Sequence, residues 1–118
     1  MEFTVFTPPV SVNHCYSQNK YGHRFMTDKG KTFKETIGWA ANEAMRGEKW
    51  SLDENYSVEI SYYFAHDRSD IDGSNKLVLD ALEGIMYEND RKVRELHCYK
   101  FLDKDNPRIK IIVNFYVP

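Results

Sequence analysis

Glycine and proline are scarce in this chain of 118 residues, which has six glycines and four prolines. A composition so poor in both excludes collagen-like repeats and long flexible linkers. Hydrophobic residues make up 42% of the chain and charged residues 29%, a balance typical of an ordinary globular domain. We therefore expect a single domain covering residues 1–118, without internal repeats.

Long apolar runs are also absent, and the N-terminus lacks a basic stretch followed by an apolar core. The first absence argues against a membrane-spanning helix and the second against a secretory leader. We expect a cytoplasmic protein with no membrane partner. Only two cysteines occur, Cys15 and Cys98, and their spacing fits no CxxC-type metal site. Two thiols do not form a disulfide framework, so we expect both to be reduced.

A large excess of charge of one sign is missing too, since the net charge is only −2. The charge is nevertheless segregated along the chain. The charged residues of segment 20–34 are basic except Asp28, whereas the charged residues of segment 67–90 are acidic except Arg68 and Lys76. Carboxylates packed this densely repel one another unless a cation lies among them. The acidic segment therefore indicates either a cation site or an ordinary solvated surface.

Hydrophobic periodicity predicts an α+β fold, with two helices packed on a small mixed β-sheet, in the order β-loop-α-β-α-β-β. The predicted strands cover residues 1–7, 57–65, 93–101 and 108–117, and the predicted helices cover residues 28–47 and 75–86.

The segments between these elements carry turn and capping signals. Thr27 or Asp28 is expected to cap the first helix, and Ser74 the second. Residues 10–28 read as an ordered loop with a small hairpin around Tyr21-Gly22. The last two strands are expected to form an antiparallel hairpin, because residues 103–107 are rich in Asp, Asn and Pro.

The most informative segment runs from Asp70 to Lys76, where a predicted strand meets a predicted helix. Asp70 and Asp72 are separated by one residue, so in an extended segment their carboxylates point to the same side and can share a cation. Oxygen ligands suit Mg²⁺, and Lys76 could meet a phosphate or a developing oxyanion. Asp90 lies beyond the predicted helix, which at about twelve residues would be about 18 Å long. It can join the pair only if the chain folds back.

A calcium-binding EF-hand is the obvious alternative for this segment. A loop of that kind starting at Asp70 would need glycine at the position of Asn75 and glutamate at the position of Ala81. Neither is present, so we exclude that interpretation.

The chain resembles the RusA-type Holliday junction resolvases, which are crossover junction endodeoxyribonucleases common in phages and prophages. The shared features extend over most of the chain: Pro8-Pro9 with Ser11, Asn13, His14 and Tyr16; Asp70-x-Asp72-x-x-x-Lys76; Asp80-Ala81-Leu82-Glu83-Gly84; Asn89-Asp90-x-x-Val93; and Lys100. Two positions depart from the family pattern, Gly73 in place of the usual Asn and Asn89-Asp90 in place of Asp-Asp.

The resemblance implies a homodimer that binds four-way or branched DNA and makes paired symmetric nicks during recombination and repair. It implies Mg²⁺, with Mn²⁺ as a possible substitute, held by Asp70, Asp72 and Asp90, and it implies a catalytic role for those acids and Lys76. A non-catalytic junction-binding protein is the alternative. A protein-interaction domain that uses exposed β edges is a third reading, but it leaves the acidic cluster unexplained.

Several further residues are candidates for DNA contact. The basic candidates are His14, Lys20, Arg24, Lys29, Lys31, Lys34, Arg68 and Lys100. Tyr16, Tyr21 and Phe25 are expected to pack in the core, with base stacking as the alternative. Glu83 is expected on the solvated face of the second helix, and Asp80 is left open between that face and a role beside the metal ligands.

Overall fold

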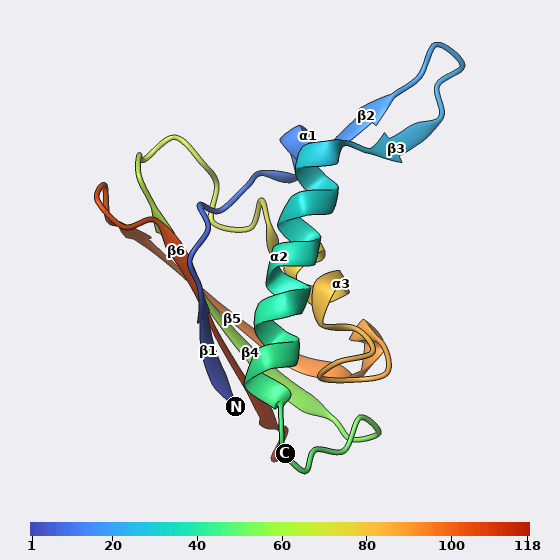
Figure 1. Cartoon of the computed structure of the whole chain (residues 1–118), viewed down its shortest axis with the longest axis vertical. Coiled ribbons are helices and arrows are strands. Elements are labelled where there is room, and N and C mark those ends of the chain that lie inside the picture. Colours follow the sequence, from blue (N-terminus) through green and yellow to red (C-terminus); the bar gives the residue numbers. More distant parts are fainter.

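The computed structural model describes residues 1–118, except the side chains of Val12 and Asn13. Its elements are β1 (Glu2–Val5), α1 (Val12–Cys15), β2 (Tyr16–Gln18), β3 (Arg24–Met26), α2 (Asp28–Met45), β4 (Tyr56–Phe64), α3 (Asn75–Leu82), η1 (Asp90–Lys92), β5 (Val93–Leu102) and β6 (Arg108–Phe115). The predicted α+β fold is confirmed: α2 and α3 pack on one face of a mixed four-stranded sheet (Figure 1).

The order of strands in the main sheet is β1-β6-β4-β5. β4 pairs in parallel with β5 and antiparallel with β6, so the predicted hairpin between the last two strands is wrong. The connection after β5 passes over the end of β4, where the N–H of Asp103 donates to the carbonyl of Phe64 at 2.8 Å. Composition gives the reason: apolar and aromatic side chains fill β4, which suits the centre of the sheet, whereas charged residues interrupt β5, which suits an edge.

The helices begin where the sequence predicts but end earlier. The hydroxyl of Thr27 accepts from the N–H of Gly30 at 3.2 Å and caps α2. α3 begins after Ser74, yet the Ser74 hydroxyl does not cap it and donates instead to the carbonyl of Val10. α3 ends at Leu82 rather than near residue 86. Among the described residues, no helix has both the length and the apolar character needed to cross a bilayer.

β2 and β3 form the hairpin predicted near Tyr21, and it projects from the body as an arm (Figure 1). We call residues 16–26 the arm. Tyr16 at its base is partly buried against the core, as expected. Tyr21 and Phe25 are 73% and 49% exposed, so the expectation that they pack in the core is wrong. The arm extends beyond the reach of the sheet and leaves them no core to enter.

Candidate active site

The first turn of α3 is tied to the sheet by Asn75. Its side-chain oxygen accepts from the hydroxyl of Tyr62 in β4 at 2.6 Å and from the thiol of Cys98 in β5 at 3.4 Å. These bonds fix the start of the helix over two neighbouring strands. Asn75 was not singled out from the sequence, because nothing in its motif shows which partners it would meet.

Lys76 follows Asn75 and reaches two carboxylates. Its Nζ lies 3.0 Å from Asp80 Oδ1, one turn along α3, and 2.9 Å from Asp90 Oδ2. Hydrogen bonds to Asp90 and Asp80 raise the pKa of the Lys76 ammonium well above its usual value. Lys76 is therefore a fixed positive charge between two acids.

Asp90 reaches Lys76 because the chain reverses directly after α3. Gly84 adopts a positive φ of 79°, which favours glycine, and its N–H donates to the carbonyl of Tyr87 at 2.7 Å. The hydroxyl of Tyr87 donates to the carbonyl of Leu79 at 2.7 Å and holds the reversed segment against the helix. Asn89 then caps η1 by accepting from a backbone N–H at 3.0 Å. The fold-back that Asp90 required is therefore present.

Asp80, Glu83 and Asp90 form a compact acidic cluster. One carboxylate oxygen of each lies within 4.8 Å of the others, and the N–H of Asp90 donates to Glu83 at 3.0 Å. Burial raises the pKa of the nearby Tyr87 hydroxyl, and the three acids raise it further. Glu83 is exposed, as expected for the solvated face of the helix, but it also supports the backbone of Asp90. Asp80 and Asp90 are connected by Lys76, whose Nζ is paired with both carboxylates.

Asp70 and Asp72 line a neighbouring cleft of about 400 Å³. The other residues that line it are Ser11, His14, Arg68, Ser69 and Gly73. The segment is a turn rather than the extended stretch that the sequence suggested, since the N–H of Gly73 donates to the carbonyl of Asp70 at 3.4 Å. Burial raises the pKa of the Tyr62 and Cys98 side chains, and the charge of Asp72 adds to this. Asp72 therefore lies near the groups that hold the start of α3.

The predicted metal ligands are thus divided between two places. Across the described residues, the group of acids whose ligand atoms all lie within 4.8 Å of one another contains Asp90 but neither Asp70 nor Asp72. The turn that carries Asp70 and Asp72 leads directly into the start of α3, from which Lys76 reaches Asp90. The carboxylates and the lysine predicted from the sequence therefore lie on two adjoining segments.

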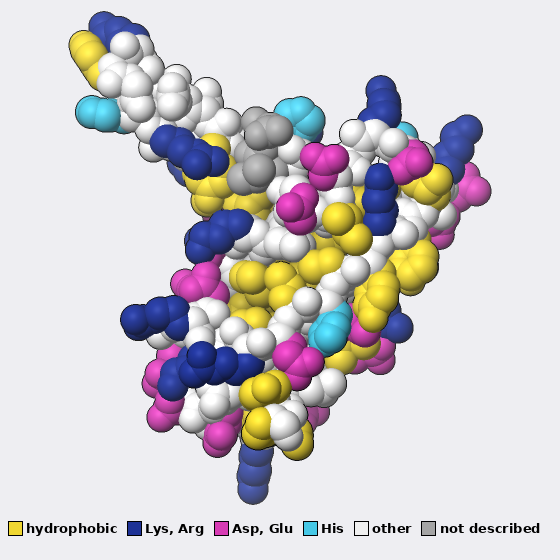
Figure 2. Space-filling view, turned by 180° about the vertical axis from the view of Figure 1, so that it is seen from behind, with side chains coloured by type: hydrophobic (Ala, Val, Ile, Leu, Met, Phe, Trp, Pro, Cys, Tyr) yellow, Lys and Arg dark blue, Asp and Glu magenta, His cyan; other side chains and the backbone are white. Residues whose placement is uncertain are grey.

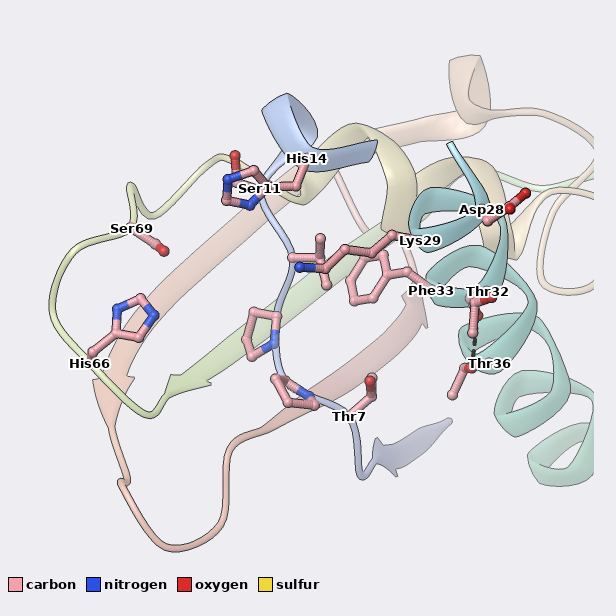
Figure 3. Close-up of a pocket in the computed structure, with 13 residues that line it drawn as sticks. Thr7, Ser11, His14, Asp28, Lys29, Thr32, Phe33, Thr36, His66 and Ser69 are labelled. Atoms are coloured by element: carbon pink, nitrogen blue, oxygen red, sulfur yellow. Dashed lines mark hydrogen bonds between the residues drawn. The ribbon is translucent and has the colours of Figure 1, made fainter. Parts of the chain in front are cut away.

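Basic candidates on α2 lie beside both groups of acids. Lys29 lines a cleft of about 600 Å³ that shares His14 with the cleft of Asp70 and Asp72. Figure 3 shows Lys29 extending from α2 toward the segment that carries Thr7 and Ser11. Lys31 and Lys34 line a third hollow together with Asp80 and Glu83.

The remaining basic candidates lie in different surroundings. Arg68 lines the cleft of Asp70 and Asp72. Lys20 and Arg24 are on the arm, at its tip and on β3. Lys100 is paired with Asp67 at 2.7 Å, and this contact lowers the pKa of the Asp67 carboxyl. The ammonium group of Lys100, one of the eight candidates, is therefore already paired with a carboxylate of this protein.

Comparison with known proteins identifies a family for the chain. Residues 6–114 match the family model described as Endodeoxyribonuclease RusA. No curated protein sequence matches the chain closely enough to count as a relative. The matched range includes every residue of both acidic groups and nearly the whole fold. The chain belongs to the RusA endodeoxyribonuclease family.

Proposed function

We propose that this protein is a metal-dependent endonuclease that resolves four-way DNA junctions by paired, symmetric nicks. One observation carries the proposal: Lys76 is held between Asp80 and Asp90 at the start of a helix that directly follows the turn of Asp70 and Asp72. Fixed positive and negative groups beside a cleft are what phosphodiester cleavage needs, because charge develops on the phosphoryl and leaving oxygens.

The chemistry of the acids fits a hard divalent cation, with Asp70 and Asp72 in one place and Asp90 beside Asp80 and Glu83 in the other. Asp70, Asp72 and Asp90 offer only carboxylate oxygens, which Mg²⁺ and Mn²⁺ prefer over nitrogen or sulfur. When bound, such an ion supplies Lewis-acid stabilisation of the charge on the phosphoryl oxygens. Asp70 and Asp72 are exposed to an incoming ligand, and Asp90 is held in place by the bond from its N–H to Glu83.

Lys76 provides the protein's own positive charge at the reaction. Asp80 orients its ammonium group through the 3.0 Å contact along α3. Because both neighbouring acids favour the protonated form, Lys76 can neutralise a phosphate oxygen or stabilise the leaving oxygen without titrating near neutral pH. Asp80 is a positioning residue in this scheme.

DNA would approach over the N-terminal part of α2 and the loop that carries Arg68. Lys29, Lys31 and Lys34 flank the hollows beside the acids, and Arg68 lies in the cleft itself. Basic side chains grouped in this way bind backbone phosphates and hold the strand over the acids.

We further propose that the protein acts as a homodimer, because a four-way junction has approximate two-fold symmetry and two nicks need two sites. β5 is an edge strand of the main sheet and carries exposed apolar side chains at Leu96, Tyr99, Phe101 and Leu102. Figure 2 shows hydrophobic side chains exposed among charged ones on the face of the molecule that is turned away from the viewer in Figure 1. Two copies related by a two-fold axis could bury this surface by pairing their β5 edges.

The proposal is tested with a synthetic four-way junction incubated with Mg²⁺, with Mn²⁺ or with EDTA. The wild-type protein should nick the junction only with metal. Loss of a residue that only supports a metal ligand lowers activity by roughly 10- to 100-fold. Asp72→Asn removes a proposed ligand itself, so it should lower the nicking rate by more than that and should still bind the junction. Asp105→Asn, which changes an exposed acid in the turn after β5, should nick normally. Junction binding by the wild-type protein without nicking would show a binding module instead.

A further inference from the structure

The tip of the arm presents an aromatic ring that the fold does not use. Tyr21 is 73% exposed, and among the described residues it belongs neither to the hydrophobic core nor to the side chains packed against it. Figure 1 shows the arm standing away from the sheet and the helices, and Figure 2 shows basic, histidine and hydrophobic side chains at its end. An exposed tyrosine at the end of a projection does not stabilise the fold. The residues around it indicate which class of partner it can bind.

The turn that carries Tyr21 is ordered by Asn19. The Asn19 side-chain oxygen accepts from the N–H of Tyr21 at 2.9 Å and from the N–H of His23 at 3.0 Å. The carbonyl of Asn19 accepts from the N–H of Gly22 at 3.0 Å, and Gly22 supplies the positive φ of 80° that this turn requires. The backbone of the turn that carries Tyr21 is therefore ordered before any partner arrives, which reduces the entropy lost on binding.

The base of the arm is fixed to the wall of the candidate active site. The hydroxyl of Thr27 donates to the carbonyl of His14 at 3.0 Å, and the N–H of Thr27 donates to the carbonyl of Cys15 at 2.8 Å. His14 lines the cleft of Asp70 and Asp72. The three residues of β2 span about 10 Å, and the turn at the tip lies beyond them. The base of the arm is therefore joined to the segment that lines the cleft of Asp70 and Asp72.

The charge on the arm selects the class of partner. Residues 16–26 contain Lys20, His23 and Arg24 and no acid. Lys20 Nζ lies 5.1 Å from the centre of the Tyr21 ring, and the Arg24 guanidinium lies 4.3 Å from the centre of the Tyr16 ring. Phosphate-binding cations next to an exposed aromatic face match single-stranded or unstacked nucleic acid, in which a base can stack while the backbone meets the cations.

We propose that the arm is a branch-reading element, in which Tyr21 stacks on an unstacked base at the crossover of a DNA junction. The inference rests on the proposed function and extends it, because it names the feature that distinguishes a junction from a duplex. In a continuous duplex every base is already stacked, so Tyr21 gains nothing there. At a branch point an unstacked base is available, and Lys20 lies close enough to meet its phosphate.

The test measures binding in EDTA, where no strand is cut. The probes are a four-way junction with 2-aminopurine at the branch point and a linear duplex of the same length. Tyr21→Ala should weaken junction binding by about 5- to 140-fold, the change expected for one lost base stack, and should leave duplex binding within about two-fold. Tyr21→Phe should restore junction binding. Trp39→Ala removes another aromatic side chain, 70% exposed on α2, and should change neither.

Three results would overturn the inference. Equal losses on junction and duplex would reduce Tyr21 to a general DNA contact, and no loss would remove it from binding. A changed molar mass of Tyr21→Ala in light scattering would show that the arm docks on a second copy. Nicking by the wild-type protein in Mg²⁺ is measured separately, which keeps this test apart from that of the proposed function. If the wild-type protein nicks the junction and Tyr21→Ala binds it normally, only the role of the arm is rejected. If Tyr21→Ala loses junction binding selectively and the wild-type protein does not nick, only the proposed nuclease activity is rejected.

Discussion

Lys76 shows most clearly, at the scale of single residues, how the sequence produces a candidate active site. It lies at the start of α3, where Asn75 connects the helix to β4 and β5, and it meets one acid along the helix and another from the returning chain. Neither contact alone would be unusual for an exposed lysine. Together they fix the ammonium group in a place where a phosphate can approach.

The raised pKa of Lys76 gives a prediction about pH. A group whose folded pKa lies above its unfolded value keeps its charge at all lower pH values and loses the associated interaction only as the pH rises through the folded pKa. The usual lysine pKa is about 10.4. The nicking rate should therefore not fall between about pH 7 and pH 9.5 through loss of the Lys76 proton.

Rates measured over that range for the wild-type protein and for Lys76→Arg, which stays charged throughout, provide the check. Because arginine differs in shape, the comparison concerns the form of the two profiles and not their height. An alkaline fall in the wild-type profile that Lys76→Arg lacks would contradict the assigned charge state.

At the scale of elements, the contact between α2 and the base of the arm depends on a glycine. A Cβ atom added at Gly30 would lie 2.6 Å from the carbonyl oxygen of Cys15, so the backbone would have to move. Gly38, further along α2, has its nearest neighbours at 3.8 Å and no such restriction.

These two glycines predict opposite effects of the same substitution. Gly30→Ala should lower the free energy of unfolding by about 1–3 kcal/mol, as expected for overpacking. Gly38→Ala should raise it by about 0.5–1 kcal/mol, because alanine loses less backbone entropy in a helix. Urea denaturation of both variants measures the two changes. A Gly30→Ala variant at least as stable as the wild-type protein would show that the base of the arm is not packed as described.

The sequence predicts the helices and strands better than it predicts which of them are neighbours. Periodicity predicted every main helix and strand, because burial of one face imposes a period on the residues. It could not place β4 between β5 and β6, since strand neighbours depend on contacts that no local pattern contains. It also could not show that the segment from Gly84 to Tyr87 returns Asp90 to Lys76, because one positive φ and one buried hydroxyl decide that path. Tyr21 was predicted to be a core residue because aromatic side chains are usually buried. Its exposure follows from the projection of the arm, which no local pattern contains.

At the scale of the whole molecule, the proposed dimer requires the exposed β5 edge to be covered by a second copy. The wild-type protein should have twice its chain mass of 13.9 kDa in light scattering. The double variant Tyr99→Lys/Leu102→Lys, which places charges on that edge, should be monomeric. Val117→Lys changes an exposed apolar side chain beyond β6 and should stay dimeric. A dimeric double variant would place the interface elsewhere, and a monomeric wild type would remove the dimer.

Paired nicking joins the site, the metal and the dimer in one reaction, and a supercoiled plasmid that extrudes a cruciform measures it directly. Two coordinated nicks across the four-way junction convert the circle to a linear molecule, whereas a single nick relaxes it and the cruciform is reabsorbed. We predict that the wild-type protein with Mg²⁺ produces linear plasmid from the earliest time points, and that Asp90→Asn leaves the plasmid supercoiled. Accumulation of nicked circles alone, or linear product in EDTA, would contradict a metal-dependent junction resolvase.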